Sequence, residues 1–222
     1  MNTAVNLPET WGQPAARTES EIFTKGMKLM DRKRYAAAQK NFDILLLLNP
    51  SNVDAILQRG ICKMHVGLVS LALDDFSEIL MHINGNPEAY AAMAEAYWMM
   101  ADYEMAKHFI DEALKAKHPL RAEWYEMGCN IYNKLGDINI AYSCINRAIV
   151  CNPFDAVLYY KRARILFNMG KIQVAVNDLN KAISFESKFV NAFKLRAECK
   201  KALGDTEGAR KDLISAGLFH KA

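Results

Sequence analysis

The sequence has no apolar run long enough for a membrane-spanning helix. Its longest conspicuous run, Ile44 to Leu48, has five residues, whereas a spanning helix needs about 18. Residues 1–20 contain neither a basic segment nor an apolar stretch of the kind found in a secretory signal. We therefore expect no membrane span, and we expect a cytosolic protein.

Cysteine is too sparse and too irregularly placed for a disulfide framework or a structural zinc site. The sequence contains five cysteines, an odd number. None of them forms a Cys-x-x-Cys pair or has the spacing of a zinc ligand set. We predict reduced, buried thiols, as is usual in the cytosol.

Catalytic and nucleotide-binding motifs are absent as well. The sequence has no GxxxxGK[ST] phosphate loop, no GxGxxG, no HExxH and no GxSxG. Its five histidines share no common place in the repeat pattern described below, and His82 and His118 fall near turns, where polar surface residues are expected. We predict no catalytic site, no metal and no cofactor, so we do not expect an enzyme.

Charge is unevenly distributed, although the net charge is only +3. Residues 1–155 contain 15 Lys and Arg against 19 Asp and Glu, whereas residues 156–222 contain 13 against six. This asymmetry indicates either an acidic partner for the C-terminal part or a solvated basic surface without a ligand. Nucleic acid is disfavoured as a partner because acidic residues interrupt the basic segment: Asp178, Glu186, Glu198, Asp205, Glu207 and Asp212.

What the sequence does have is a period of 34 residues. Three series of small residues recur at this interval: Gly136, Gly170 and Gly204; Ala141, Ala175 and Ala209; Ala148, Ala182 and Ala216. Self-similarity at a period of 20–50 residues is typical of an array of small structural units. The series therefore predict a repeat protein.

Each repeat is predicted to be a pair of helices. In residues 122–155, apolar and small residues at helical spacing predict a first helix over 122–135, and Gly136 supplies the left-handed residue that ends it. A second helix is predicted over 139–151, and Asn152-Pro153 ends it because the residue before proline is disfavoured in a helix. Cys129 occupies the place that Ala163 and Ala197 take in the next two repeats, so it replaces a small apolar residue.

The same register extends over almost the whole chain. It divides the sequence into repeats 19–52, 53–86, 87–121, 122–155, 156–189 and 190–222. Residues 1–18 precede it and are predicted to be a flexible N-terminal tail, since Pro8, Gly12 and Pro14 interrupt any helix there. We expect an all-α repeat domain over residues 19–222.

This pattern resembles the tetratricopeptide repeat, in which large, small and aromatic residues and a proline recur at fixed places. Repeat 122–155 carries the resemblance at Tyr125, Cys129, Tyr132, Ala141, Ile145, Ala148 and Pro153. The resemblance implies a right-handed α-solenoid of about six antiparallel helix pairs, a superhelix whose concave groove is lined by the first helix of each pair. Proteins of this kind bind partners without catalysing reactions.

The resemblance also assigns residues to the groove. Its N-terminal half is apolar and rich in methionine: Phe23, Met27, Met30, Leu57, Ile61, Met64 and Trp98. Its C-terminal half is polar and basic: Asn130, Asn133, Arg164, Phe167, Asn168, Lys194 and Lys201. We expect Trp98, Met64 and Met27 to be the anchors for an apolar peptide. The alternative is that these side chains pack on neighbouring helices or are covered by the tail.

The polar half suggests an extended peptide. Asparagine can pair with a backbone amide through its donor and its acceptor, and Arg164, Lys194 and Lys201 could receive a carboxylate. Family members that hold the C-terminus of heat-shock chaperones carry Lys and Asn at two fixed places of one repeat. Those places are occupied here by Phe23/Met27, Leu57/Ile61, Ala91/Glu95, Glu126/Asn130, Tyr160/Arg164 and Lys194/Glu198. No repeat fits, so that function is disfavoured.

Three functions remain open at this point. The first is a scaffold or adaptor that binds an extended or helical peptide segment in the groove. The second is a chaperone-like holder of apolar segments in client proteins, of the secretion or assembly type. The third is a structural subunit that self-associates through uncapped ends of the array.

Overall fold

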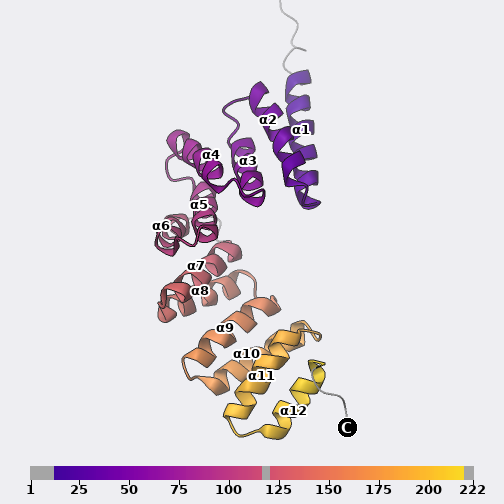
Figure 1. Cartoon of the computed structure of the whole chain (residues 1–222), viewed down its shortest axis with the longest axis vertical. Helices are drawn as coiled ribbons and strands as arrows, with labels where there is room; N and C mark the ends of the chain where they lie inside the picture. Colours follow the sequence, from indigo (N-terminus) through magenta and orange to yellow (C-terminus); the bar gives the residue numbers. More distant parts are fainter. Residues whose placement is uncertain (1–12, 117–120, 218–222) are drawn as a thin grey trace, which may run out of the picture. The chain divides into compact units, whose positions relative to one another are not determined.

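The computed structural model describes residues 13–116 and 121–217, with side chains from Thr18 onward. These residues form twelve α-helices and no strand (Figure 1), which confirms the predicted all-α repeat fold. The chain divides into two compact units, unit 1 over Met1–Ala113 and unit 2 over Leu114–Ala222. Each unit is described by itself.

Six helix pairs follow one another along the chain. In unit 1 they are α1 Gln13–Asp31 with α2 Tyr35–Leu48, α3 Val53–His65 with α4 Val69–His82, and α5 Pro87–Met99 with α6 Tyr103–Leu114. In unit 2 they are α7 Ala122–Leu135 with α8 Ile138–Cys151, α9 Ala156–Asn168 with α10 Ile172–Phe185, and α11 Val190–Ala202 with α12 Thr206–Ser215. Each predicted repeat therefore holds one pair.

The N-terminal boundary differs from the prediction. Helix α1 begins at Gln13 and includes Pro14, whereas the sequence placed the end of a flexible tail at residue 18. Proline is compatible with the first turn of a helix because the N–H that it lacks would have no partner there. Pro14 therefore does not keep residues 13–18 out of the helix, and residues 1–12 of the predicted tail lie outside the described residues.

The turn inside each pair requires a left-handed residue. Gly67, Gly136, Gly170 and Gly204 adopt φ values of 74° to 86° there, as predicted for Gly136. The first and third pairs carry Lys33 (φ 57°) and Ala101 (φ 59°) at this place. A side chain makes this conformation costly, by roughly 1–2 kcal/mol.

Within a pair, a small residue on the first helix is combined with a large residue on the second. A Cβ atom at Gly26 would lie 2.7 Å from the Phe42 ring, and one at Gly60 would lie 2.4 Å from the Phe76 ring. In unit 2 the residue on the first helix is larger than glycine and its partner on the second helix is smaller than phenylalanine. These pairs are Cys129 with Ile145 and Ala163 with Leu179, all in one buried cluster. The predicted role of these small residues in close helix packing is thus visible in the structure.

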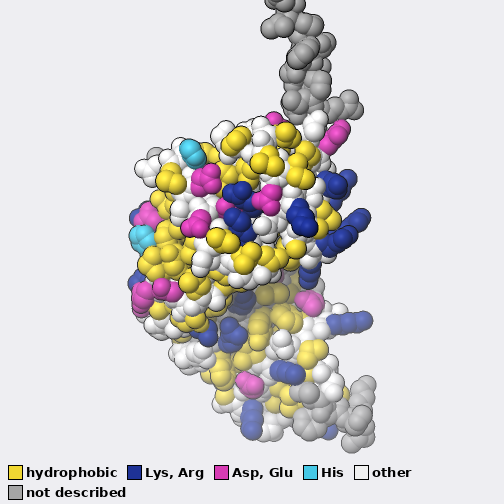
Figure 2. Space-filling model, turned by 45° about the horizontal axis from the view of Figure 1, so that its top comes forward, with side chains coloured by type: hydrophobic (Ala, Val, Ile, Leu, Met, Phe, Trp, Pro, Cys, Tyr) yellow, Lys and Arg dark blue, Asp and Glu magenta, His cyan; other side chains and the backbone are white. Residues whose placement is uncertain are grey.

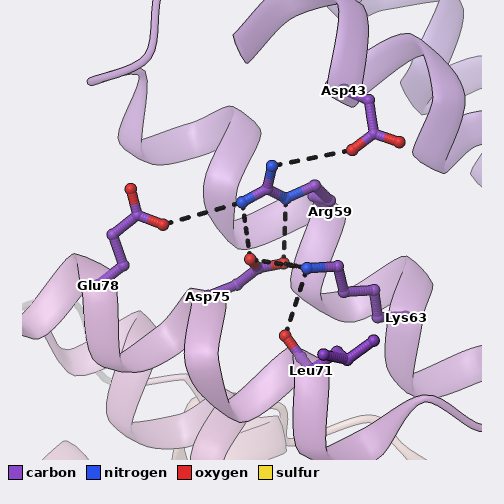
Figure 3. Close-up of polar contacts among 6 residues, drawn as sticks. All are labelled: Asp43, Arg59, Lys63, Leu71, Asp75 and Glu78. Carbon is purple, nitrogen blue, oxygen red and sulfur yellow. Dashed lines mark hydrogen bonds and ion pairs between the residues drawn. The ribbon is translucent and has the colours of Figure 1, made fainter.

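Buried ion pairs join the two helices of three repeats. Arg59 contacts Asp75, Arg162 contacts Asp178 and Arg196 contacts Asp212, with Nη2–Oδ1 distances of 2.7, 2.7 and 2.6 Å. The three aspartates are only 3–4% exposed. Figure 3 shows the first of these clusters, in which Lys63 also reaches Asp75 and Arg59 extends toward Asp43 on α2 and Glu78 on α4.

Candidate peptide-binding face

The first helices of unit 1 carry a row of half-buried apolar side chains. Phe23, Met27 and Met30 project from α1 and pack against a buried cluster that includes Ala38 and Phe42. The rings of Phe23 and Phe42 meet edge to face, with centroids 5.7 Å apart. These side chains thus contribute to packing and still present part of their surface to solvent.

Helix α3 continues the row with Leu57 and Ile61, both half-buried. Leu57 packs against the buried cluster that includes Phe42 and also against a second buried cluster, which includes Phe76 and Met93. A shallow hollow of about 250 Å³ lies between α1 and the start of α3. It is lined by Glu19, Ser20, Phe23, Asn52 and Asp54, so polar and acidic side chains border Phe23 there.

Met64 does not belong to this face, and its prediction as an anchor is wrong. Its side chain is 1% exposed. It lies in the buried cluster formed with Ala72 and Phe76 of α4 and Ala92 and Met93 of α5. At this place in α3 the side chain fills the space between two successive pairs, where a bound peptide has no access.

Trp98 lies near the end of α5 and is half-buried. Its ring is tilted against that of Tyr103 on α6, with centroids 5.1 Å apart. The next two residues, Met99 and Met100, are about half exposed, at 49% and 50%. Trp98 is therefore held by the turn of its own pair and keeps an accessible face beside two methionines that the sequence reading did not select as anchors.

The first helices of unit 2 present polar side chains. Arg164, Asn168 and Lys201 are exposed, whereas Asn130, Asn133, Lys194 and Phe167 are half-buried, and Phe167 packs against the core cluster of the unit. Helices α9 and α11 contact each other, so the side chains of Arg164 and Lys194 belong to adjacent first helices.

The side chain of Lys161 already occupies one acceptor position of the Asn130 amide. Its ammonium forms an ion pair with Glu126 of α7 and donates a hydrogen bond to Oδ1 of Asn130 at 3.4 Å. Because the amide oxygen of Asn130 already accepts this bond, its NH₂ group is the part best placed to contact a ligand. The oxygen has a second lone pair, so the prediction that Asn130 pairs with a backbone through both donor and acceptor stays a prediction, with Lys161 as a neighbour of any ligand.

Most of the thiols are inert. Burial raises the pKa of Cys62 and of Cys199 to about 11, and it raises the pKa of Cys129 to about 12. Cys144 is buried as well, but Cys151 is exposed, which corrects the expectation that all five thiols are buried. Within residues 13–116 and 121–217, no group of three or more His, Cys, Asp or Glu is arranged to hold a metal ion.

Comparison with known proteins identifies the repeat. The family described as tetratricopeptide repeat matches residues 87–117 and 156–189. The solved structure of PilF of Pseudomonas aeruginosa superimposes with a TM-score of 0.81 over 90% of this chain and 91% of that one, at 14% sequence identity. The chain contains tetratricopeptide repeats. The likeness to PilF shows the fold alone.

Two other proteins are similar to this chain over most of its length. YrrB, described as a TPR protein with an unusual peptide-binding site, has a TM-score of 0.69 and 19% identity over 79% of this chain and 90% of that one. The tetratricopeptide repeat and J domain-containing co-chaperone DNJ1 of Fusarium oxysporum is 24% identical over 200 residues, which are 90% of this chain and 33% of DNJ1. The matches cover only 13% to 40% of the length of such curated relatives.

In this tetratricopeptide repeat protein no described helix combines the length and the apolar character that crossing a membrane requires. Repeats of this family form surfaces for partner proteins. The two first-helix faces are therefore the candidate surfaces for binding a partner protein.

Proposed function

We propose that this protein is a non-catalytic scaffold that binds an apolar peptide segment, extended or helical, on the first-helix face of unit 1. The observation that carries the proposal is the row of accessible apolar side chains on three successive first helices: Phe23, Met27, Met30, Leu57, Ile61 and Trp98. Methionine suits such a surface because its flexible side chain adapts to varied partners. Trp98 and Met27 stay as anchors, and Ile61 takes the place of the buried Met64.

The first-helix face of unit 2 is assigned to a polar or acidic part of a partner. Arg164 and Lys201 are exposed and Lys194 is half-buried, so they can meet a carboxylate with little loss of hydration. Guanidinium groups bind carboxylates in bidentate fashion. We do not assign one continuous ligand to both units.

A random 12-residue peptide library displayed on phage tests the unit 1 face. Wild-type protein is expected to enrich peptides with two or more large apolar residues. The variant Ile61→Ser/Trp98→Ala is expected to lose this enrichment, because each truncated anchor costs about 1–3 kcal/mol. The matched control is Leu47→Ser/Met81→Ser, which removes two exposed apolar side chains from second helices. Enrichment that survives in the Ile61/Trp98 variant refutes the proposal.

A chaperone-like holder of apolar client segments is the second candidate, and the match to a J-domain co-chaperone over 90% of the chain favours it. It uses the same unit 1 face but requires no defined sequence in the client. Wild-type protein is then expected to suppress the light scattering of a heat-unfolded reporter enzyme at equimolar ratio. Strong peptide selection without any suppression favours the scaffold, and suppression without selection favours the holder.

Stacking through the α1 end is the weakest of the three functions. The side chains that α1 turns away from its buried cluster are polar, and five of them line an open hollow of about 320 Å³: Ser20, Glu21, Thr24, Lys25 and Lys28. A polar outer face is the usual property of a terminal repeat that does not stack. The cytosolic location predicted from the sequence remains a prediction.

A further inference from the structure

The second helices of unit 1 carry an exposed aliphatic patch. It consists of Ile44, Leu47 and Leu48 near the end of α2 and Met81 near the end of α4. Leu47 is 83% exposed and Met81 is 78% exposed, and these two residues occupy the same place in successive repeats. Two large apolar side chains that are this exposed at equivalent places are unusual for a surface with no contact partner.

Helices α2 and α4, which carry the patch, lie close to each other. Leu80, next to Met81, packs against the cluster that contains Leu45 and Leu46, the residues next to Leu47. The guanidinium of Arg59 links the same helices, since it lies 3.8 Å from Asp43 of α2 and 3.8 Å from Glu78 of α4. The view over the N-terminal helices in Figure 2 shows exposed hydrophobic side chains around such a mixed group of charges.

Acidic side chains outnumber basic ones beside this aliphatic patch. Asp43 and Glu78 are 45% and 38% exposed, and Asp74 is exposed one turn before Glu78. Two basic side chains lie among them: Lys40 on the exposed side of α2, and Arg59, which pairs with both Asp43 and Glu78. Counted over the sequence, unit 1 holds ten Lys and Arg against 15 Asp and Glu, a net charge of −5.

Unit 2 carries an exposed aromatic patch formed by Val150, Phe154 and Phe185. Val150 is 81% exposed and Phe154 is 76% exposed. The rings of Phe154 and Phe185 meet edge to face at 5.8 Å, and Phe185 also contacts Tyr159 at 5.6 Å. The loop after α8 and the end of α10 therefore contribute to one surface, and Val150, at the end of α8, lies four residues before Phe154.

Basic side chains outnumber acidic ones beside the aromatic patch. The ammonium of Lys181 lies 5.3 Å from the centre of the Tyr159 ring, and Arg147 and Lys188 are exposed within three residues of Val150 and Phe185. Asp155 and Glu186 are the acidic residues nearest in sequence. Unit 2 as a whole holds 18 Lys and Arg against ten Asp and Glu, a net charge of +8.

We propose that the aliphatic patch of one copy of this chain binds the aromatic patch of a second copy. Each patch offers exposed apolar side chains. Acidic side chains are in excess beside the aliphatic patch and in unit 1, and basic side chains are in excess beside the aromatic patch and in unit 2, so each patch complements the other better than it complements itself. Such an interface is heterologous: every bound copy still presents one free patch, and association continues into chains or closes into a ring. The proposal uses second helices and the loop after α8, and it is independent of the peptide-binding face.

The association is weak and salt-sensitive. Patches of three or four side chains bury far less than the roughly 800 Å² per partner of a stable complex. Opposite charges at the rim speed association and are screened by salt, since the Debye length falls from about 10 Å at 0.1 M to about 3 Å at 1 M. Assembly is therefore expected at about 100 µM protein and low salt.

Sedimentation velocity of the purified chain from 5 to 300 µM tests the proposal. In 50 mM NaCl the weight-average sedimentation coefficient is expected to rise with concentration, and in 500 mM NaCl the rise is expected to shift to at least tenfold higher concentration. Leu47→Glu and Phe154→Glu are each expected to remain monomeric. Both side chains are largely exposed, so unchanged circular dichroism and melting temperature serve as the folding control.

Mixing the two variants gives the decisive result. The Leu47→Glu protein retains its aromatic patch and the Phe154→Glu protein retains its aliphatic patch. Their equimolar mixture is therefore expected to form a 1:1 dimer and nothing larger. A wild type that is monomeric at 300 µM overturns the proposal, as does a monomer that binds a lysine-rich amphipathic peptide at the aliphatic patch. Association of the Leu47→Glu variant with itself overturns it as well.

Discussion

Arg196 and Asp212 form a bidentate ion pair that joins α11 to α12. Nη2 of Arg196 lies 2.6 Å from Oδ1 of Asp212, and Nε lies 2.9 Å from Oδ2. Lys200 approaches the same carboxylate at 2.9 Å. Burial by itself raises the pKa of Asp212, but the hydrogen bonds from Arg196 and Lys200 outweigh it and hold the pKa below its ordinary value.

Asp212→Asn is expected to lower the free energy of unfolding at pH 7 by about 2–3 kcal/mol, because it leaves two cations close to a neutral amide. The carboxylate stabilises the fold at pH values above its unfolded-state pKa of about 3.9. That stabilisation is lost as the pH falls through the lower folded-state pKa. Urea unfolding at pH 7 and at pH 3 should therefore show the difference from wild type shrinking in acid.

Glu207→Gln is the matched control for this prediction. Glu207 contacts Arg210 at 3.3 Å, but both side chains are more than half exposed. An exposed pair of this kind contributes about 0–1 kcal/mol, so the variant should unfold close to wild type at both pH values. If Asp212→Asn changed the free energy of unfolding no more than Glu207→Gln does, the buried carboxylate would contribute no more to stability than an exposed one, and the prediction would be wrong.

The ion pair of the fifth repeat should be replaceable by apolar residues. Met93 and Phe109 stand in the third repeat at the places of Arg162 and Asp178, and both pack in one hydrophobic cluster. Arg162→Met alone is expected to cost about 3 kcal/mol, since it leaves a buried carboxylate unpaired. Arg162→Met/Asp178→Phe is expected to recover most of that loss. Additive costs in this double-mutant cycle, measured by thermal unfolding, would contradict the expectation.

Two helical glycines should respond differently to alanine. At Gly60 the new Cβ would lie 2.4 Å from the Phe76 ring, so Gly60→Ala is expected to destabilise the protein by about 1–3 kcal/mol. At Gly128 the nearest atom outside its own helix is Sγ of Cys144 at 3.4 Å. Gly128→Ala is expected to be neutral or to gain up to about 1 kcal/mol from helix propensity. Equal melting temperatures for the two variants would refute the size matching described above.

The turn of the third pair should gain from a glycine. Ala101 has φ 59°, in the region where glycine carries no Cβ penalty. Ala101→Gly is expected to stabilise the protein by about 0.5–1 kcal/mol, and Gly136→Ala, at φ 86°, is expected to destabilise it by about 1–2 kcal/mol. Chemical denaturation of both variants provides the measurement, and opposite signs are the expected result.

The sequence predicted the fold well because its 34-residue period comes from local features. The glycine at 136 and the pair Asn152-Pro153 end helices by backbone geometry alone, and the structure ends α7 at Leu135 and α8 at Cys151. The start of α1 was missed because Pro14 was taken to interrupt a helix, although proline fits a first turn.

The candidate site was predicted less completely because a place in a repeat does not fix exposure. Met64 and Trp98 hold equivalent places, yet Met64 is buried among α4 and α5 residues and Trp98 remains accessible. The difference in exposure depends on the side chains that surround each residue in its own pair and in the next pair, and the repeat period does not determine those side chains. The buried ion pairs were missed too, although Arg and Asp spaced by 16 residues recur in the second, fifth and sixth repeats. That recurrence is a signal by which a search could have found them.

Methionine-methyl NMR of the full chain tests the peptide-binding face most directly. A peptide enriched from the 12-residue library is added to protein labelled at its methionine methyl groups. The account predicts concentration-dependent shifts of Met27 and Met30 on α1, and no shift of Met81, which is 78% exposed on a second helix. Shifts at Met81 with Met27 and Met30 unchanged would contradict it.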